Sequence, residues 1–557
     1  MEIPGNEHQS VAMDHHGLVA ATCIDLKLAN RIDRLLPKSD HRRVVSTGQS
    51  AVAMILNGLG FTNRRLYLTH QFFENKPIQR LLGVDIKASD LTDDTLGRAL
   101  DEIASYGSSK LFGEIAFDVA LENNLLKSIN HLDTTSLTVH GSYDAPEEEG
   151  VIKLNHGYSK DHRPDLKQAV LSLVVNGPSA MPIWMEPLNG NSSDKTSFHE
   201  TIKKIEEFKR QIDLKSRFKW VADSALYTEK KLLKNNDYLW LTRVPENIKE
   251  AKKLVQLPME DVTWVEQEKG YKTSCFISNY GDIEQRWLLV FSEQAYKREK
   301  KTFDKRLLKQ EEELKKELWH LGCQEFQCEE DAKSALKKLA KKYRYYEITS
   351  HIEMKFKYKK KGRPKENDEQ EVVGYIINSR INRNEVEIKK MLKQKGRFIL
   401  ATNDMDTINY PDIKILSEYK EQQSVEHGFR FLKDPWFMID SIFLKTPKRI
   451  EALMMIMTMC LMVYNISQYK LRETLKSQNE TLPNQLNKQI QNPTMRWIFQ
   501  LMEGISISRY YDHFGKLTKE CMVNLSELRI KIIRLFGETA SYMYGLIKKN
   551  PAEVLGT

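Results

Sequence analysis

The sequence has little of what marks secreted or membrane-spanning proteins. Six cysteines are spread over 557 residues with no Cys-x-x-Cys pair, which fits reduced thiols in a cytosol-like compartment. Residues 1–17 carry charges and histidines where a signal peptide needs an apolar stretch, so nothing there directs secretion. The longest apolar run, residues 452–466, is shorter than the roughly 20 residues that span a bilayer. We therefore expect an intracellular protein with a buried helix at 452–466.

The composition is that of a folded chain with several domains and an excess of positive charge. Hydrophobic residues make up 41% and charged residues 29%, a balance that excludes a disordered chain, and 557 residues exceed one hydrophobic core. The net charge of +9 fits a polyanionic partner, although proteins without one share it. Residues 297–365 alone hold 22 Lys and Arg against 12 Asp and Glu. The charge is thus concentrated, as a DNA-facing surface requires.

Between residues 129 and 243 the sequence is rich in short runs typical of β-strands. We predict five strands, at residues 132–139, 150–154, 168–175, 217–223 and 238–244. Helical spacing follows at residues 197–212 and 228–234. The order βββαβαβ matches the ribonuclease H-like fold, an α/β sheet covered by helices, in which one further helix completes the core.

This order predicts a catalytic core that is interrupted by an insertion. The predicted parts are a helical DNA-binding or dimerisation module (1–125), the first part of the core (126–245), an inserted β-rich basic domain (246–395), the second part of the core (396–475) and a helical C-terminal region (476–557). The insertion also holds two charged helices, at 295–319 and 329–345.

The basic charge of the insertion has two interpretations. On the two helices we favour ordinary solvated faces with i,i+4 ion pairs. The strand at 355–365 interleaves aromatic residues with six lysines and ends in Gly-Arg-Pro, so we expect Lys359, Lys360 and Arg363 to contact DNA. A zinc site built from His320, Cys323 and Cys328 is a weaker alternative.

Two aspartates lie on predicted strands that are expected to pair. Asp133 lies on the first strand and Asp223 ends the fourth, and these positions are adjacent when the two strands pair in the middle of the sheet. Either residue alone is better explained as a turn or cap residue. Together they can share a metal ion, and Mg²⁺ prefers oxygen ligands. Two such ions stabilise the attacking and the leaving oxygen of a phosphoryl transfer.

The third carboxylate is expected from an amphipathic helix over residues 411–433. At 100° per residue Glu426 lies on a polar stripe with Tyr419, Gln422 and Lys433. An apolar stripe beside it consists of Val425, Phe429 and Leu432. The helix can therefore pack on the sheet while it directs Glu426 at the aspartates, although an ordinary surface helix with an exposed glutamate has the same pattern.

These residues resemble the DDE transposases of bacterial insertion sequences, within them the insertion-sequence-four superfamily and its sixteen-thirty-four branch. The branch signature is Tyr, two residues, Arg, three residues, Glu, six residues and Lys. Tyr419, Gln422, Glu426 and Lys433 match that spacing with Gln in place of Arg. The resemblance extends over LDTTSLTVHGSY (132–143), HGYSKDHRPDLKQ (156–168), PLNGNSSDKTSF (187–198), ADSALY (222–227) and LTRVP (241–245).

The resemblance implies a cut-and-paste transposase that hydrolyses DNA at the ends of an insertion sequence and joins the freed 3′-hydroxyls to target DNA. Asp133, Asp223 and Glu426 would bind two Mg²⁺ ions, for which Mn²⁺ can substitute. Tyr419 and Lys433 would hold terminal phosphates of the element, and the insertion would clamp DNA. A homodimer on DNA, in a bacterial cytoplasm and associated with the nucleoid, is also implied.

Further DNA contacts are expected around these motifs. Gln422 lacks the guanidinium of the family's arginine, and Arg430 lies at 20° on the same stripe, close enough to replace it. The charged loop that carries Lys160, His162 and Arg163 could face target or flanking DNA, although such loops are often merely solvated. Trp264 and Trp287 are candidates for stacking on a flipped base, although a tryptophan in a strand more often belongs to the core.

Two other functions remain open at this point. A host nuclease on the same fold would cleave DNA without joining strands. A DNA-binding protein derived from a transposase would keep the basic insertion but would not need three carboxylates.

Overall fold

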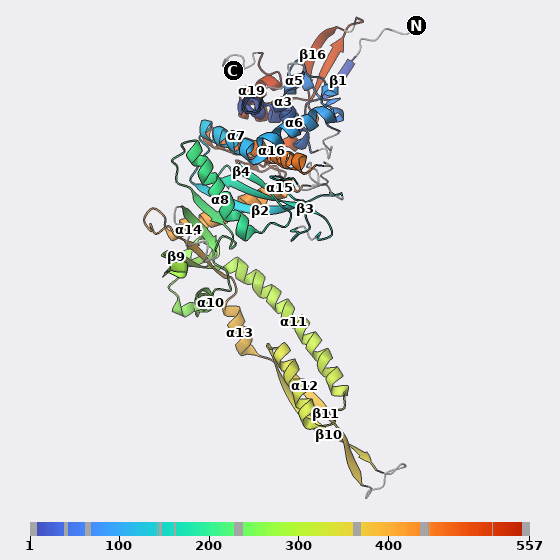
Figure 1. Ribbon diagram of the computed structural model, residues 1–557, viewed down its shortest axis with the longest axis vertical. Helices are drawn as coiled ribbons and strands as arrows, with labels where there is room; N and C mark the ends of the chain where they lie inside the picture. Colours follow the sequence, from blue (N-terminus) through green and yellow to red (C-terminus); the bar gives the residue numbers. More distant parts are fainter. Residues whose placement is uncertain are drawn as a thin grey trace. The chain divides into compact units, whose positions relative to one another are not determined.

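The protein is a mixed α/β chain with a large mixed sheet and many helices (Figure 1). The structure is a computed structural model that describes residues 8–37, 43–61, 68–141, 143, 148–160, 163–227, 238–359, 369–434, 444, 446–514 and 516–548. Its contacts divide the chain into two compact units. Unit 1 comprises Met1–Leu241 and Ser417–Thr557, and unit 2 comprises Thr242–Leu416.

Unit 1 begins with a strand and a group of helices. These elements are β1 (His8–Ala12), α1 (His16–Asp25), α2 (Leu28–Leu35), α3 (Thr47–Gly58), α4 (Thr69–Phe73), α5 (Ile78–Leu82), η2 (Ala88–Asp90), α6 (Asp93–Tyr106) and α7 (Ser108–Glu122). The short helices expected in this region are therefore present. Ser46 and Gln49 form a reciprocal cap at the start of α3, which satisfies backbone donors that a helix otherwise leaves open.

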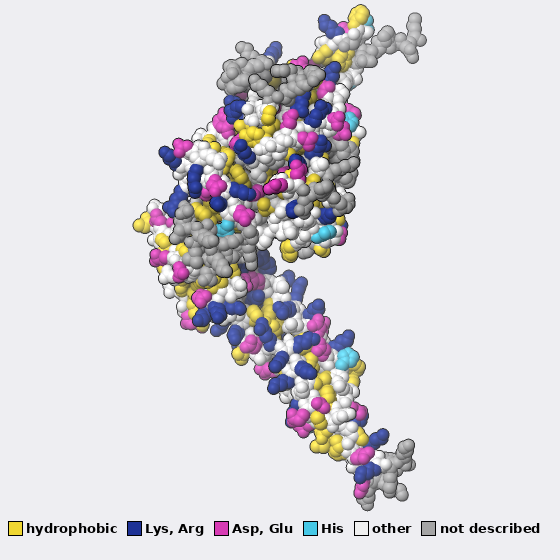
Figure 2. Space-filling view, in the orientation of Figure 1, with side chains coloured by type: hydrophobic (Ala, Val, Ile, Leu, Met, Phe, Trp, Pro, Cys, Tyr) yellow, Lys and Arg dark blue, Asp and Glu magenta, His cyan; other side chains and the backbone are white. Residues whose placement is uncertain are grey.

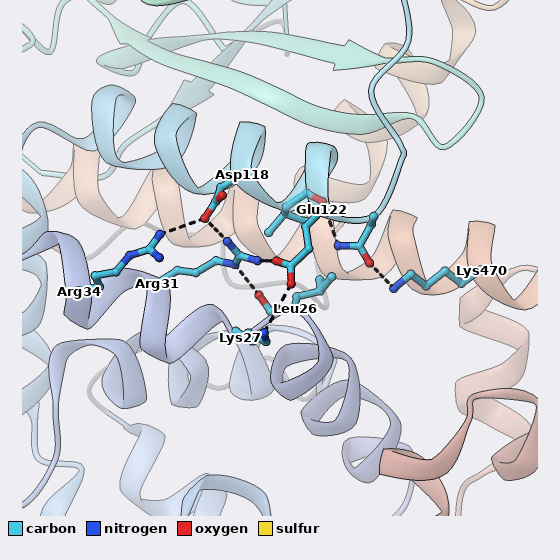
Figure 3. A network of polar contacts seen from close by, with 9 residues as sticks. Leu26, Lys27, Arg31, Arg34, Asp118, Glu122 and Lys470 are labelled. Carbon is cyan, nitrogen blue, oxygen red and sulfur yellow. Dashed lines mark hydrogen bonds and ion pairs between the residues drawn. The ribbon is translucent and has the colours of Figure 1, made fainter. Parts of the chain in front are cut away.

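A polar network attaches this helical group to α7 (Figure 3). Arg31 of α2 donates hydrogen bonds to both Asp118 and Glu122 of α7, and its side chain is only 7% exposed. Arg34 adds a bond of 3.0 Å to Asp118, and Lys27 lies 3.5 Å from Glu122. A guanidinium that bridges two carboxylates fixes both helices in one geometry, so the network determines how α2 lies on α7.

The sheet of unit 1 has the strand order β4-β3-β2-β5-β6. Its strands are β2 (Ile129–Thr138), β3 (Gln168–Asn176), β4 (Met181–Leu188), β5 (Lys219–Ala222) and β6 (Leu239–Arg243). β3 is antiparallel to both β2 and β4, whereas β2 and β5 run parallel. A parallel pair in the middle of the sheet places the carboxyl ends of β2 and β5 on the same edge.

The prediction of a strand at residues 150–154 is wrong, and the strand β4 was not predicted. Residues 150–154 form turns and irregular backbone, in which the backbone N–H of Ile152 donates to Glu451 at 2.7 Å instead of to a neighbouring strand. The third strand is β4, whose Pro182 and Pro187 argue against a central strand. The strand tolerates both prolines because it lies at the edge of the sheet.

Helices cover both faces of this sheet. They are α7, α8 (Asp194–Gln211), α15 (Gln423–Leu432), which α14 (Asp412–Lys420) precedes, and α16 (Pro447–Ser477). Ser172 of β3 lies 3.4 Å from Thr201 of α8, while the next residue, Leu173, contacts Gly428 of α15. Successive strand residues point to opposite faces, so α8 and α15 lie on opposite sides of the sheet. The helix predicted over 228–234 lies outside the described residues.

The apolar run predicted as a buried helix forms the middle of α16. This helix is long and apolar enough to cross a bilayer, but 89% of its most apolar window is buried inside the protein. It packs beside α7 against β4 and also contacts α1, α3 and α6 (Figure 1). The prediction of a buried helix is therefore confirmed, and α16 is the central element of the unit 1 core.

The C-terminal part of unit 1 was expected to be helical and contains strands as well. Its elements are β13 (Leu482–Pro483), β14 (Gln489–Ile490), α17 (Met495–Leu501), β15 (Ser506–Tyr511), β16 (Leu517–Val523), α18 (Glu527–Leu535) and α19 (Glu538–Met543). β15 pairs with β16 on one side and with β1 on the other. The two ends of the chain therefore share one small sheet.

Unit 2 contains four strands in the order β12-β9-β8-β7 and a group of helices with a long hairpin. Its elements are α10 (Lys249–Val255), η3 (Met259–Asp261), β7 (Val265–Gln267), η4 (Glu268–Gly270), β8 (Tyr271–Ser278), η5 (Tyr280–Asp282), β9 (Gln285–Ser292), α11 (Glu293–Cys323), α12 (Glu329–Lys342), β10 (Tyr346–Tyr358), β11 (Gln370–Arg383), α13 (Glu385–Lys393) and β12 (Arg397–Thr402). The two charged helices predicted in this region are α11 and α12. We call residues 293–383, which contain α11, α12 and the β10–β11 hairpin, the arm.

Candidate active site

The two candidate aspartates stand at the same level of adjacent strands. His131 of β2 pairs with Val221 of β5. Asp133 lies two residues beyond His131, and Asp223 lies two residues beyond Val221, directly after the last residue of β5. Neighbouring strands are about 4.8 Å apart, so the two carboxylates belong to one edge of the sheet. The sequence prediction that β2 and β5 bring these residues together agrees with this register.

The face on which Asp133 lies is the face that α15 covers. Asp133 pairs with Leu173 of β3, and residues directly opposite in an antiparallel pair share a face. A Cβ on Gly428 of α15 would stand 3.6 Å from Leu173 and 3.1 Å from Leu461 of α16. The carboxylate of Asp133 therefore points to the side of the sheet that carries Glu426.

Glu426 lies on the solvent side of α15. The predicted apolar stripe is confirmed, because Val425, Phe429 and Leu432 are buried against the sheet and α16. The Glu426 side chain is 57% exposed, and Arg430 lies 3.9 Å from it. Arg430 and Glu426 are thus neighbours on one helix face, as the helical spacing of 100° per residue predicted.

The single helix predicted over residues 411–433 is wrong, because the chain forms α14 and α15 with a tightened turn between them. The N–H of Gln422 donates to Tyr419 at 3.2 Å, and the N–H of Val425 donates to Gln422 at 3.1 Å. These bonds span three residues instead of four, which changes the angular phase between the two helices. Tyr419 lies on α14 and Gln422 precedes α15, so the predicted stripe continues unbroken only from Glu426 to Lys433.

Asp133 has a defined electrostatic environment. Its Oδ1 accepts a hydrogen bond of 2.7 Å from the N–H of Thr134, and the ammonium of Lys160 lies 3.8 Å from the same oxygen. Burial lowers the pKa of nearby His131 to about 4, so this imidazole is neutral at pH 7 and adds no charge. Asp223 accepts a bond of 2.9 Å from the N–H of Ala225. Each aspartate is held by backbone near its own strand end.

Divalent metal ions fit the chemistry of these residues, although the three carboxylates do not form one group. Among the described residues, no three His, Cys, Asp or Glu side chains meet closely enough to hold a metal ion. Asp133 and Asp223 nevertheless supply hard oxygen donors from one sheet edge, and Glu426 supplies a third from the helix over the same face. The alternative zinc site at His320, Cys323 and Cys328 is not formed either, since all three are described residues.

The predicted DNA contacts outside this centre that belong to the described residues lie on exposed surfaces. Arg163 makes a bidentate pair with Asp165, whose pKa the guanidinium lowers to about 2. On the arm, Lys359 lies 3.0 Å from Glu369. His162, Lys360 and Arg363 lie outside the described residues.

The helices of the arm carry mixed surface charge. Lys and Arg side chains lie along them interspersed with Asp and Glu (Figure 2). Exposed i,i+4 ion pairs include Lys297–Glu293, Lys315–Glu311 and Lys333–Glu329. The interpretation of α11 and α12 as solvated faces agrees with these pairs.

The two tryptophans considered for base stacking are packed within unit 2. Trp287 on β9 is 3% exposed, and its Nε1 donates to Gln285 at 3.1 Å. Trp264 donates to the carbonyl of Met259 at 3.1 Å and lies against Arg397, whose guanidinium is 5.6 Å from the ring centroid. The core interpretation therefore holds for Trp287.

One buried ion pair beside the site was not predicted. Lys219, the first residue of β5, lies 3.6 Å from Glu418 of α14, and the two side chains are 10% and 5% exposed. The pair connects β5, which Asp223 directly follows, to α14, which precedes α15. A lysine inside the apolar run RFKWVA was the available signal, because a charge in a buried strand requires a partner.

Two family models match this sequence. A model described as the transposase DDE domain matches residues 125–463, and one described as a domain of unknown function (DUF4277) matches residues 8–117. The first match covers more than half of the chain and includes all three candidate carboxylates. The chain therefore belongs to the family of the transposase DDE domain.

Among solved structures, the chain is similar to the cryo-EM structure of the piggyBac transposase synaptic complex with hairpin DNA. The similarity covers 89% of this chain and 82% of that chain, with 10% sequence identity and a TM-score of 0.37. At this TM-score the likeness carries no part of the function proposed below. No curated protein matches the sequence.

Proposed function

We propose that the protein is a cut-and-paste transposase of an insertion sequence, with a ribonuclease H-like core and a DDE active site at Asp133, Asp223 and Glu426. The observation that carries this proposal is the shared register of the two aspartates on adjacent parallel strands, with α15 on the same sheet face. The strand order of unit 1 and the match to the transposase DDE domain over residues 125–463 support it.

In this proposal the protein positions DNA and metal ions for phosphoryl transfer. Asp133 and Asp223 would hold two divalent ions, Mg²⁺ or Mn²⁺, from the strand ends, and Glu426 would add a third carboxylate from α15. When bound, the ions would supply the positive charge that phosphoryl transfer requires. The strands and the helix that carry the three carboxylates are rigid elements, so they would hold these side chains in fixed positions.

Basic and polar residues around the carboxylates would bind the DNA backbone. Tyr419, Gln422, Arg430 and Lys433 lie on or beside α15, and Arg430 supplies the guanidinium that Gln422 lacks. Lys160, His162 and Arg163 would contact the DNA backbone near Asp133. Lys359, Lys360 and Arg363 of the arm would grip terminal-repeat or target DNA, and two copies of the chain would bring two ends together.

The test is metal-dependent cleavage of the DNA that borders the gene. Asp133→Ala, Asp223→Ala and Glu426→Ala should each lower the cleavage rate by at least about 10³-fold in Mg²⁺ while binding of the same duplex is retained. Glu207→Ala, which removes an exposed carboxylate of α8, is the matched control and should cleave normally. Normal cleavage by the three site variants would refute the assignment.

Strand joining separates the proposal from its alternatives. A transposase joins the freed 3′-ends to a target plasmid, so gel analysis should reveal joined products. A host nuclease would yield cleaved ends without joined products. A DNA-binding protein without catalysis would bind the bordering duplex but would yield neither cleaved ends nor joined products.

A further inference from the structure

The segment of residues 155–160 is fixed against the sheet of unit 1. Asn155 and Gln168 exchange backbone hydrogen bonds of 3.3 and 3.0 Å. The side chain of Gln168 is 1% exposed, and its Nε2 donates to the carbonyls of Tyr158 at 3.2 Å and Gly190 at 2.7 Å. A buried amide that bridges two backbone segments holds both in place.

Two glycines bring these segments closer than any side chain would permit. A Cβ on Gly157 would stand 2.2 Å from the carbonyl oxygen of Gly190, and one on Gly190 would stand 2.0 Å from that of Gln168. Both distances are far inside van der Waals contact. The backbone that leads to Lys160 is therefore packed directly on the loop after β4.

This fixed segment delivers Lys160 to the strand that carries Asp133. The N–H of Lys160 donates to Ser136 Oγ at 3.0 Å. Its ammonium donates to the carbonyl of Thr134 at 2.6 Å and to Thr134 Oγ1 at 3.1 Å, and it stands 3.8 Å from Asp133 Oδ1. These partners lie where β2 extends beyond the end of β5, which is also where Asp223 follows.

The arrangement differs from that of an ordinary surface ion pair. Lys160 is 35% exposed and Asp133 is 20% exposed, so neither group is fully solvated. The separation of 3.8 Å is longer than a hydrogen bond, and the ammonium is oriented by Thr134 instead of by the carboxylate. An ammonium that donates its hydrogen bonds to Thr134 and stands 3.8 Å from a candidate metal-binding carboxylate lies close to where a phosphate bound at that carboxylate would be.

We propose that Lys160 binds a non-bridging oxygen of the phosphate at which DNA is cut and joined; this rests on the proposed function. In cleavage, a water oxygen bonds to phosphorus, the bond from phosphorus to the 3′-oxygen breaks, and the 3′-oxygen leaves and takes up a proton. In joining, the 3′-hydroxyl oxygen loses its proton and bonds to a target phosphorus, the bond from that phosphorus to the target 3′-oxygen breaks, and the target 3′-oxygen leaves and takes up a proton. Lys160 keeps its protons throughout and donates a hydrogen bond to the oxygen on which negative charge accumulates.

The experiment compares Lys160→Ala and Lys160→Arg with Lys153→Ala, which removes an exposed lysine two residues before the fixed segment. The probe is a linear duplex that contains the DNA bordering the gene. Lys160→Ala should cleave it about 10²-fold more slowly in single turnover, with duplex affinity within about 3-fold of the wild type. Lys160→Arg should recover about a tenth or more of the rate, because it keeps the charge. Lys153→Ala should behave as the wild type.

A sulfur substitution identifies the atom that Lys160 contacts. Each non-bridging oxygen of the cleaved phosphate is replaced by sulfur in turn. For one of the two diastereomers, sulfur should slow cleavage by the wild type but hardly change the rate of Lys160→Ala. That variant has already lost the hydrogen bond from Lys160 to this oxygen. Equal sulfur effects in both proteins, for both diastereomers, would overturn the proposal.

Binding of Mn²⁺ without DNA separates this role from structural support of Asp133. Electron paramagnetic resonance should find Mn²⁺ bound by Lys160→Ala as tightly as by the wild type or a few-fold more tightly, because a like charge has been removed. Binding weakened about 10-fold or more would mean that Lys160 only positions Asp133, and would overturn the proposal.

The two proposals fail in different ways. If Asp133→Ala cuts the duplex as well as the wild type, the proposed function fails and this inference fails with it. If Asp133→Ala is inactive but Lys160→Ala cuts normally, the inference alone is overturned and the proposed function stands.

Discussion

The two units of the chain are stabilised in different ways. In unit 1 one large apolar cluster runs from the N-terminal helices across the α15 side of the sheet and α16 to the C-terminal helices. Among the described residues of the arm, seven buried side chains form one small cluster with Ile388 of α13, three form another, and exposed ion pairs lie along the surface of the helices. Exposed pairs of this kind contribute little to stability.

The difference indicates where function can change without loss of the fold. The candidate carboxylates rest on elements of the large core, so their geometry depends on packing across all of unit 1. The arm depends on local helix formation and a few contacts, so it can open or change while unit 1 remains folded.

The largest effect is expected from a cavity in the unit 1 core. Leu461 of α16 is 1% exposed and lies under Gly428 of α15. Leu461→Ala should lower the free energy of unfolding by about 2–5 kcal/mol, because burial is lost and a cavity remains. Calorimetry measures the change, and Leu486→Ala, at a position 76% exposed, is the control. Equal effects of the two substitutions would contradict a continuous core.

A matched cavity in the arm should act locally. Leu314 of α11 is fully buried, whereas Leu308 of the same helix is 55% exposed. Leu314→Ala should raise hydrogen exchange throughout α11 and β10, with unit 1 protected as before, and Leu308→Ala should change neither. Loss of protection in unit 1 would show that the arm and the core unfold together.

A smaller effect is expected from acid, and it should distinguish the units. Burial lowers the pKa of His15 to about 4, below its usual 6.5. Above pH 6.5 His15 is neutral in both the folded and the unfolded state, so it does not make the free energy of unfolding depend on pH. As the pH falls from 6.5 toward 4, only the unfolded state binds the proton, and the free energy of unfolding decreases. Between pH 7.5 and 5, urea unfolding of unit 1 should lose about 2 kcal/mol from this residue alone.

The control for this pH effect comes from unit 2. Its two histidines, His320 and His351, are both exposed. His15→Gln should reduce the pH dependence of unit 1, to which the buried His16 and His131 also contribute, whereas His351→Gln should leave it unchanged. A pH dependence that is the same in both variants would refute the assignment to His15.

The sequence predicts strands better where one physical signal acts alone. β2, β3, β5 and β6 were found because β-branched and aromatic residues cluster there without prolines. β4 was missed because its two prolines are compatible only with an edge strand, and edge position is a property of the assembled sheet. The turn between α14 and α15 was missed because apolar spacing continues across it.

For the candidate site, the sequence predicts the positions but not their surroundings. Strand order places Asp133 beside Asp223, and helical spacing places Arg430 beside Glu426. The distance from Lys160 to Asp133 depends on the contact of Gly157 with Gly190, which joins two segments more than thirty residues apart. The partner of Lys219 likewise lies on α14, about two hundred residues along the chain.

The pairing of β1 with β15 bears on how the protein is made. His8–Ala12 leaves the ribosome nearly five hundred residues before its partner, Ser506–Tyr511. The hydroxyl of Tyr544 also donates to the carbonyl of Asp14. The small sheet therefore forms only after β15 has been synthesised. A chain that stops before residue 506 keeps β1 without its neighbour, so this part of unit 1 depends on residues far along the chain.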